Sequence, residues 1–226
     1  MTKLTVIIPV YNEIETFPII LERIRSLPVD KEIVVVDNVS TDGTRELVAA
    51  LDGEDGVQVI LQQVNRGKGD SVRKGIAAAR GEYLVIQDAD LEYEPVEILD
   101  LLSRAESGAD AVFGSRLLGT RPRVPLHHAL GRDLLNGLFN VLYGSRITDV
   151  ATCYKLIRTE VAQSLVLRSV GFDLDYEIAC RLRQAGVAIV ELPVSYRPRT
   201  LEEGKKLRWT DGLRAMLALV RFRVTR

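Results

Sequence analysis

The segment Tyr83-Leu84-Val85-Ile86-Gln87-Asp88-Ala89-Asp90 joins a short apolar run directly to a pair of carboxylates. An uninterrupted apolar run of this length is typical of a strand in a parallel sheet that is covered on both faces. The carboxylates cannot continue into the core, because a buried and unpaired charge is costly. Asp88 and Asp90 therefore follow the carboxyl end of a strand, which is where α/β sheets bind their ligands.

Predicted strands and helices alternate on both sides of this segment. Further β-branched or aromatic runs predict strands at Val6–Ile8 (within the apolar run Leu4–Val10), Ile33–Val36, Val57–Leu61, Ala111–Phe113 and Ala188–Val194. Amphipathic stretches predict helices at Glu15–Ser26, Thr44–Leu51, Ser71–Ala79, Val96–Ser107, Leu126–Tyr143, Asp173–Ala185 and Trp209–Arg226. This alternation with short connections predicts an α/β sandwich with a mostly parallel sheet and right-handed crossovers.

The composition excludes several classes of protein. The 226 residues are 46 % hydrophobic and 27 % charged, which predicts one globular domain with a substantial core. The 30 Lys+Arg nearly balance the 31 Asp+Glu, so no nucleic-acid partner is expected. The two cysteines, Cys153 and Cys180, are expected to be reduced thiols of a cytoplasmic protein. No apolar stretch reaches the ~20 residues that cross a bilayer.

Three predicted strands end in polar side chains that are expected to meet at one edge of the sheet. Tyr11 and Glu13 follow the first strand, Asp37 the second, and Asp88 and Asp90 the fourth. An aromatic ring with carboxylates that accept hydrogen bonds suits a base and its ribose. Paired carboxylates also suit Mg²⁺ or Mn²⁺ shared with a diphosphate. Glu92 could supply a third oxygen.

Each of these patterns has a purely structural alternative, and two familiar phosphate motifs are missing. The acidic pair could simply cap the next helix, as could Ser40, Thr41 and Asp42. Residues 65–71, Asn-Arg-Gly-Lys-Gly-Asp-Ser, lack the Walker spacing, and no G-x-G-x-x-G follows a strand. A P-loop and a nicotinamide site are therefore not expected, and Lys68 is expected near a nucleotide instead.

Taken together, the motifs resemble family-2 glycosyltransferases, and within them the polyprenyl-phosphate (dolichyl-phosphate) mannosyl- or glucosyltransferases. The resemblance rests on VIIPVYNE (6–13), VDNVSTDGT (36–44), the run from Asn65 to Pro95, GSR (114–116) and RTLEEGKKL (199–207). It implies a GT-A fold, a Rossmann-like α/β/α sandwich, in a single domain of residues 1–226. Residues 1–115 would form the nucleotide-sugar half, 116–206 an acceptor half with mobile loops, and 207–226 an amphipathic helix.

The resemblance also assigns roles to individual residues. It implies that the nucleotide sugar is held by Pro9, Tyr11, Glu13, Asp37, Lys68, Asp88, Ala89 and Asp90, and the metal by Asp88, Asp90 and Glu92. Arg116, Arg199, Lys205 and Lys206 would bind an acceptor phosphate. The chain departs from the family pattern in three places. Relatives carry an aspartate at the position of Asn38, and residues 148–155 also differ. In the late basic loop, Arg199 and Lys206 lie one residue further apart than in the dolichyl enzymes. These departures concern the sugar and the acceptor rather than the fold.

The reaction implied is an inverting sugar transfer from a GDP-mannose or UDP-glucose type of donor to a polyprenyl phosphate. Asp90, Arg116 and Asp149 are the expected catalytic residues. A phosphate acceptor has a second pKa of about 6 and already attacks as an oxyanion. A hydroxyl acceptor would need a carboxylate base, for which Asp149 is the first candidate, followed by Asp175 and Glu177. Ion pairs with basic neighbours are the alternative role for these three residues.

Two other functions and the role of the C-terminal helix stay open. The chain could be a soluble family-2 enzyme that glycosylates a hydroxyl, or a non-catalytic protein that binds nucleotide sugars.

Residues 197–226 contain nine Lys or Arg against three acids, and Trp209–Arg226 is amphipathic. This pattern predicts either contact with the inner face of the cell membrane, or packing on the sheet or on a second copy of the chain. His127 and His128 are expected in the acceptor region and not at a metal.

Overall fold

The computed structural model describes residues 2–54, 56–119, 126–199 and 209–224. For residues 126–128, 209–211, 213 and 214 it describes the backbone alone, so the expectations for His127 and His128 lie outside the described side chains. Lys205 and Lys206 lie outside the described residues altogether.

A seven-stranded sheet forms the centre of the protein, in the order β3-β2-β1-β4-β6-β5-β7. The strands are β1 (Leu4–Val10), β2 (Lys31–Asp37), β3 (Val57–Leu61), β4 (Tyr83–Ile86), β5 (Ala111–Ser115), β6 (Lys155–Arg158) and β7 (Ile189–Pro193). All neighbouring pairs are parallel except those of β6, which runs antiparallel to β4 and β5. The α/β class with a mostly parallel sheet is thereby confirmed.

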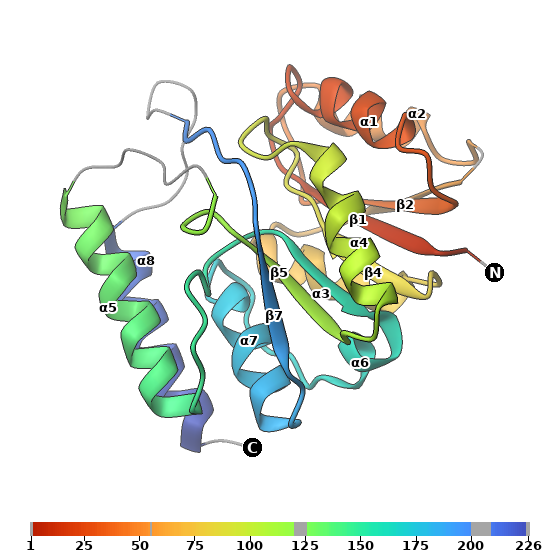
Figure 1. Ribbon diagram of the computed structural model, residues 1–226. Helices are drawn as coiled ribbons and strands as arrows, with labels where there is room; N and C mark the ends of the chain where they lie inside the picture. The colour runs from red at the N-terminus through yellow and green to blue at the C-terminus, as the bar shows by residue number, and fades with distance from the viewer. Residues whose placement is uncertain (1, 55, 120–125, 200–208, 225–226) are drawn as a thin grey trace.

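Helices cover the sheet, and two of them pack together beyond one end of it. They are α1 (Phe17–Arg25), α2 (Thr44–Ala50), α3 (Lys68–Ala78), α4 (Ile98–Glu106, preceded by the 3₁₀ turn Pro95–Glu97), α5 (Leu126–Tyr143), α6 (Thr159–Ser164), α7 (Leu174–Gln184) and α8 (Trp209–Val224). Figure 1 shows the sheet between α4 and α3, with α5 and α8 side by side beyond α7. Each predicted helix is present; Leu126–Tyr143 has the predicted bounds, and the described ends of the others differ from the prediction by at most three residues.

The structure adds one strand and one helix that the sequence pattern did not predict. β6 has only four residues, Lys-Leu-Ile-Arg, so its apolar part is too short to stand out. It separates β5 from β4, and α6 follows it directly. Lys155 is fully buried and its ammonium group is paired with Asp175 at 3.0 Å. A lysine is rarely buried without a partner, which is why the sequence alone argues against a core strand here.

Candidate active site

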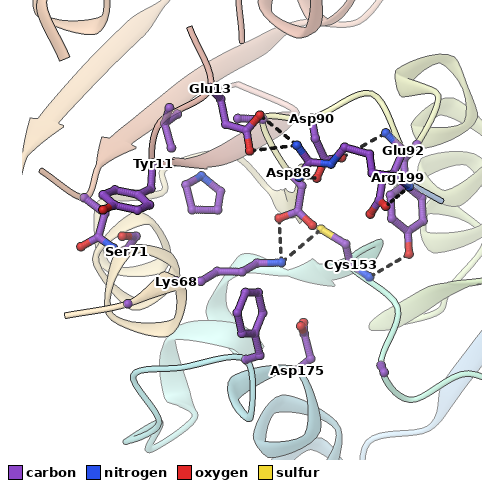
Figure 2. Close-up of a pocket in the computed structure, with 18 of the residues that line it drawn as sticks. Tyr11, Glu13, Lys68, Ser71, Asp88, Asp90, Glu92, Cys153, Asp175 and Arg199 are labelled. Carbon is purple, nitrogen blue, oxygen red and sulfur yellow. Dashed lines mark hydrogen bonds and ion pairs between the residues drawn. The ribbon is translucent and has the colours of Figure 1, made fainter. Parts of the chain in front are cut away.

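A cavity of about 360 Å³ opens at the carboxyl ends of β1, β2 and β4. Its lining comes from segments that are far apart in the sequence: residues 9–13 after β1, Asn38 after β2, residues 65–71 at the start of α3, residues 88–93 after β4, and residues 151–153, 172–175 and 196–199. Figure 2 shows these side chains pointing toward one another around the cavity. The predicted meeting of three strand ends is therefore present in the structure.

The loop after β1 is held in place by the loop after β2. The Asn12 backbone has a positive φ of 52° and its N–H donates to Ser40 Oγ at 3.0 Å. The Glu13 N–H donates to Thr44 Oγ1 at 3.1 Å. Asp42 accepts from the backbone N–H of Ile14 at 3.2 Å. These side chains position Tyr11 and Glu13 at the cavity, so the structural and the functional interpretation of residues 37–44 both contribute.

Asp37 does not lie where the resemblance to the family implies, whereas its neighbour Asn38 reaches the cavity. The Asp37 carboxylate is fully buried and accepts hydrogen bonds from the backbone N–H groups of Val39 and Ser40 and from the Arg45 guanidinium. Asp37 is not part of the cavity lining, whereas Asn38 is. Asp37 therefore shapes the loop, and its neighbour presents an amide to the cavity.

Asp88 and Asp90 lie side by side at the far end of β4, and each is paired with a cation. Lys68 lies 2.6 Å from Asp88, and Arg199 lies 2.7 Å from Asp90. Burial opposes ionisation of Asp88, but the Lys68 ammonium holds its pKa below the ordinary value. Burial, and then the negative charge of Asp88, raise the pKa of Asp90 to about 7. Two closely spaced carboxylates that repel each other attract positive charge to this edge of the sheet.

The residues present fit a divalent cation that is shared with a ligand. Among the described residues, no three His, Cys, Asp or Glu side chains converge to form a metal site of their own. Asp88 and Asp90 supply hard oxygen donors, and Mg²⁺ typically takes its remaining ligands from phosphates and water. Glu92 instead accepts hydrogen bonds from the Tyr196 hydroxyl at 3.0 Å and from the Arg199 backbone N–H at 2.7 Å. Its carboxylate therefore anchors the segment that carries Arg199.

Lys68 is aimed at Asp88 by a close approach of two backbone segments. The Gly69 N–H donates to the Val170 carbonyl at 2.8 Å. Gly67 has a φ of 96°, and a Cβ there would lie 2.5 Å from the Val170 oxygen. Only glycine fits such a contact with that backbone conformation. The Lys68 ammonium also lies 5.9 Å from the centre of the Phe172 ring.

Arg116 is held by Asp149 and stacks on Tyr196. Its Nε and Nη2 atoms donate to the two Asp149 oxygens at 2.7 Å each, and its carbon Cζ lies 5.0 Å from the Tyr196 ring centre. Burial opposes ionisation of Asp149, but the Arg116 hydrogen bonds keep its pKa below the ordinary value. Asp149 itself does not line the cavity. It therefore positions Arg116, whose guanidinium has further N–H donors for a ligand.

The other two candidate bases are also engaged. Asp175 lines the cavity and pairs with Lys155, while Glu177 accepts hydrogen bonds from the backbone N–H groups of Arg168 and Ser169. Apart from Asp37, the structure brings all the predicted nucleotide and metal residues to one cavity, together with Arg116 and Arg199. Sequence reasoning did not assign Asn65, Tyr93, Cys153, Phe172 and Tyr196, which also line it. Two lining residues gave a signal as departures from the family pattern: Asn38, and Cys153 within residues 148–155.

Comparisons with known proteins identify the family of the chain. Residues 5–166 match the model of the family described as Glycosyl transferase family 2. Glycosyltransferase AglJ of Haloferax volcanii is 29 % identical over 196 residues, which are 86 % of this chain but only 63 % of that protein. Polyprenol monophosphomannose synthase of Mycolicibacterium smegmatis is 32 % identical over 210 residues, 88 % of this chain and 79 % of the relative.

A solved structure shows the same fold. Glucosyl-3-phosphoglycerate synthase from Mycobacterium tuberculosis, determined in complex with Mn²⁺, UDP and phosphoglyceric acid, superposes with a TM-score of 0.74. Its sequence is 20 % identical, and the match covers all of this chain and 80 % of that one. The likeness confirms the GT-A type of α/β fold that the motifs imply. The family model and the relatives show that the chain belongs to glycosyl transferase family 2.

Proposed function

We propose that this protein transfers a sugar from a nucleotide-diphosphate sugar to a polyprenyl phosphate, with inversion at the anomeric carbon. The observation that carries the proposal is the pairing of Asp88 with Lys68 and of Asp90 with Arg199 at one cavity edge. Opposite charges at one ligand-binding edge suit a diphosphate and its cation. The acceptor is suggested by the name of the Mycolicibacterium smegmatis relative.

The engaged carboxylates favour a phosphate acceptor over a hydroxyl. Asp149 is paired with Arg116, Asp175 with Lys155, and Glu177 with two backbone N–H groups. A hydroxyl would have to lose its proton to a base during attack. A phosphate monoester needs no such base, because its second pKa is about 6. Arg116 and Arg199 would hold that phosphate, assisted by Lys205 and Lys206.

In this mechanism the chain binds and orients two anionic substrates. Tyr11 stacks on the base, and Pro9 and Glu13 border the ribose. Mg²⁺ or Mn²⁺ held by Asp88 and Asp90 would stabilise the negative charge that develops on the leaving diphosphate. Lys68 adds fixed positive charge beside Asp88. The acceptor oxygen attacks the anomeric carbon from the side opposite the diphosphate.

The test is transfer of radiolabelled sugar from GDP-mannose or UDP-glucose, with Mn²⁺, into a polyprenyl phosphate that is extracted into organic solvent. We expect labelled lipid with the intact chain and none with Asp90→Ala. The matched control is Asp100→Ala, which removes an exposed carboxylate on α4 and should leave the rate unchanged. Label found only in a water-soluble alcohol would support the hydroxyl-specific alternative. No transfer to any acceptor would support the non-catalytic one.

A second proposal concerns the face formed by α5 and α8. α8 packs into the protein through Ala215, Leu219 and Phe222, and the Tyr143 hydroxyl donates to the Leu219 carbonyl at 2.9 Å. Its outward side exposes Leu217, Val220 and Val224, and α5 beside it exposes Leu130, Leu134 and Val141. No helix among the described residues is long and apolar enough to cross a bilayer. We propose that this apolar face, with the exposed Arg221 and Arg223, rests on an anionic membrane surface.

A further inference from the structure

The nucleobase end of the cavity presents amides in place of the expected carboxylate. Tyr11 lines this end, and Figure 2 shows Ser71 next to its ring, away from Asp90 and Glu92. Asn38 and Asn65 line the same cavity. Asp37, which the family pattern places here, is turned to Arg45 and the loop backbone. The groups that could read a base are therefore different from those that the motif implies.

Backbone N–H groups fix the orientation of both amides. The Arg66 N–H donates to Asn38 Oδ1 at 3.1 Å, so the Asn38 nitrogen points to Asn65 and donates to its Oδ1 at 2.9 Å. The Gly67 N–H donates to the same Asn65 oxygen at 3.2 Å. Because a backbone N–H can only donate, neither amide can be turned over without losing these bonds.

The fixed orientation leaves hydrogen-bond donors for a ligand. Asn38 Nδ2 has a second hydrogen, and the nitrogen of the exposed Asn65 side chain has no protein acceptor among the described residues. Ser71 Oγ accepts from Gln62 Nε2 at 2.7 Å, which leaves its hydroxyl hydrogen to donate. The carboxylates that line the cavity are engaged elsewhere, by Lys68, Lys155 or Arg199. The base end is therefore rich in donors and poor in acceptors.

Uracil and guanine differ in the hydrogen-bond donors and acceptors that they would present to these amides. Uracil presents two carbonyl oxygens, one on each side of its N3–H group. Along its Watson–Crick edge, guanine presents one carbonyl oxygen beside an N1–H group and an amino group. Donors placed against that edge would leave N–H groups facing N–H groups, and donors left without an acceptor weaken binding. The donor-rich end thus matches uracil.

We propose that Asn38 and Asn65 make this protein select UDP-sugars over GDP-sugars. The inference rests on the proposed function, since it assigns the nucleotide of the same donor site. The motif departs from the family pattern at this point, because Asn38 stands where relatives carry an aspartate. The preference should appear in binding of the nucleotide alone, without any acceptor.

The test is calorimetric titration of the full chain with UDP and with GDP in the presence of Mn²⁺. We expect UDP to bind about ten-fold more tightly than GDP or better. Asn65→Asp keeps an oxygen for the Gly67 and Asn38 donors but replaces the outward N–H group by a carboxylate oxygen. This variant should lose most of the UDP preference, mainly through weaker UDP binding. Asn38→Ala should reduce the preference as well, because it removes a donor without adding charge.

The control is Gln63→Glu, which adds the same negative charge to an exposed side chain of the same segment. It should leave the UDP-to-GDP ratio unchanged. Equal or tighter GDP binding to the intact chain, or an unchanged ratio in Asn65→Asp, would overturn the inference while the proposed function stood. Failure of both nucleotides to bind would contradict the proposed function itself, and the inference with it.

Discussion

At the scale of single residues, Asp149 offers the clearest distinction between positioning and catalysis. Its carboxylate binds Arg116 through two hydrogen bonds and accepts a third from the Arg116 backbone N–H at 3.0 Å. Asp149→Asn should displace the guanidinium and lower kcat/KM for the acceptor by about a hundred-fold. The change should lie in the acceptor KM, with the nucleotide Kd unaltered. A fall in kcat at constant KM would identify Asp149 as a base instead.

Glu32 provides a pH-dependent prediction away from the cavity. The carboxylate is buried on β2; burial opposes its ionisation, but hydrogen bonds from Thr5 and Arg80 hold its pKa below the ordinary 4.5. The stabilisation is therefore complete above pH 4.5 and is lost as the pH falls through the lower folded-state pKa.

Glu32→Gln should lower the free energy of unfolding by about 1–2 kcal/mol at pH 7. The difference from the intact chain should shrink toward pH 3, which urea unfolding followed by circular dichroism can measure. A difference that stays constant across this range would show that packing, rather than charge, accounts for the loss.

At the scale of secondary-structure elements, the α5–α8 face predicts binding to anionic vesicles. Leu217 is 71 % exposed and Val224 77 %, and both lie on the outward side of α8. A charged side chain at either residue would have to enter the lipid boundary without a partner. Leu217→Glu and Val224→Glu should each reduce co-sedimentation with phosphatidylglycerol vesicles several-fold.

Val96→Glu is the matched control, because Val96 is 62 % exposed but lies on the turn before α4. Vesicle binding that is equal in all variants would contradict the membrane proposal. A concentration-dependent dimer that the α8 variants abolish would assign the face to a second copy of the chain.

The elements also show what the sequence could and could not predict. Strands such as Val57–Leu61 and Tyr83–Ile86 were predicted with the observed bounds, because both runs are rich in the β-branched or aromatic residues that favour strands. β6 was not, since its buried Lys155 is acceptable only beside Asp175, a residue of α7. The same distinction between local pattern and distant partner applies to the site. Asp88 and Asp90 could be predicted from their strand, whereas the places of Asn38 and Asp37 depend on Arg45 and on contacts across the loop.

At the scale of the whole molecule, ion pairs join parts of the chain around the cavity that are far apart in sequence. Arg199 bonds both Glu13 and Asp90, although it lies more than a hundred residues from either in sequence. Lys68 and Asp88 join α3 to β4 in the same way. A nucleoside diphosphate with its cation would bridge these groups and stabilise the folded chain by mass action.

We therefore expect UDP or GDP at about a hundred times its Kd, with Mn²⁺, to stabilise the protein by about 2.7 kcal/mol. For a chain of this size that corresponds to a rise in Tm of roughly 5–10 °C. EDTA should remove most of the rise, because the diphosphate would then meet Asp88 and Asp90 without an intervening cation. Asp90→Ala should show a small rise that EDTA does not change, while Asp100→Ala should respond like the intact chain. A full rise that persists in EDTA would place the nucleotide away from these two carboxylates.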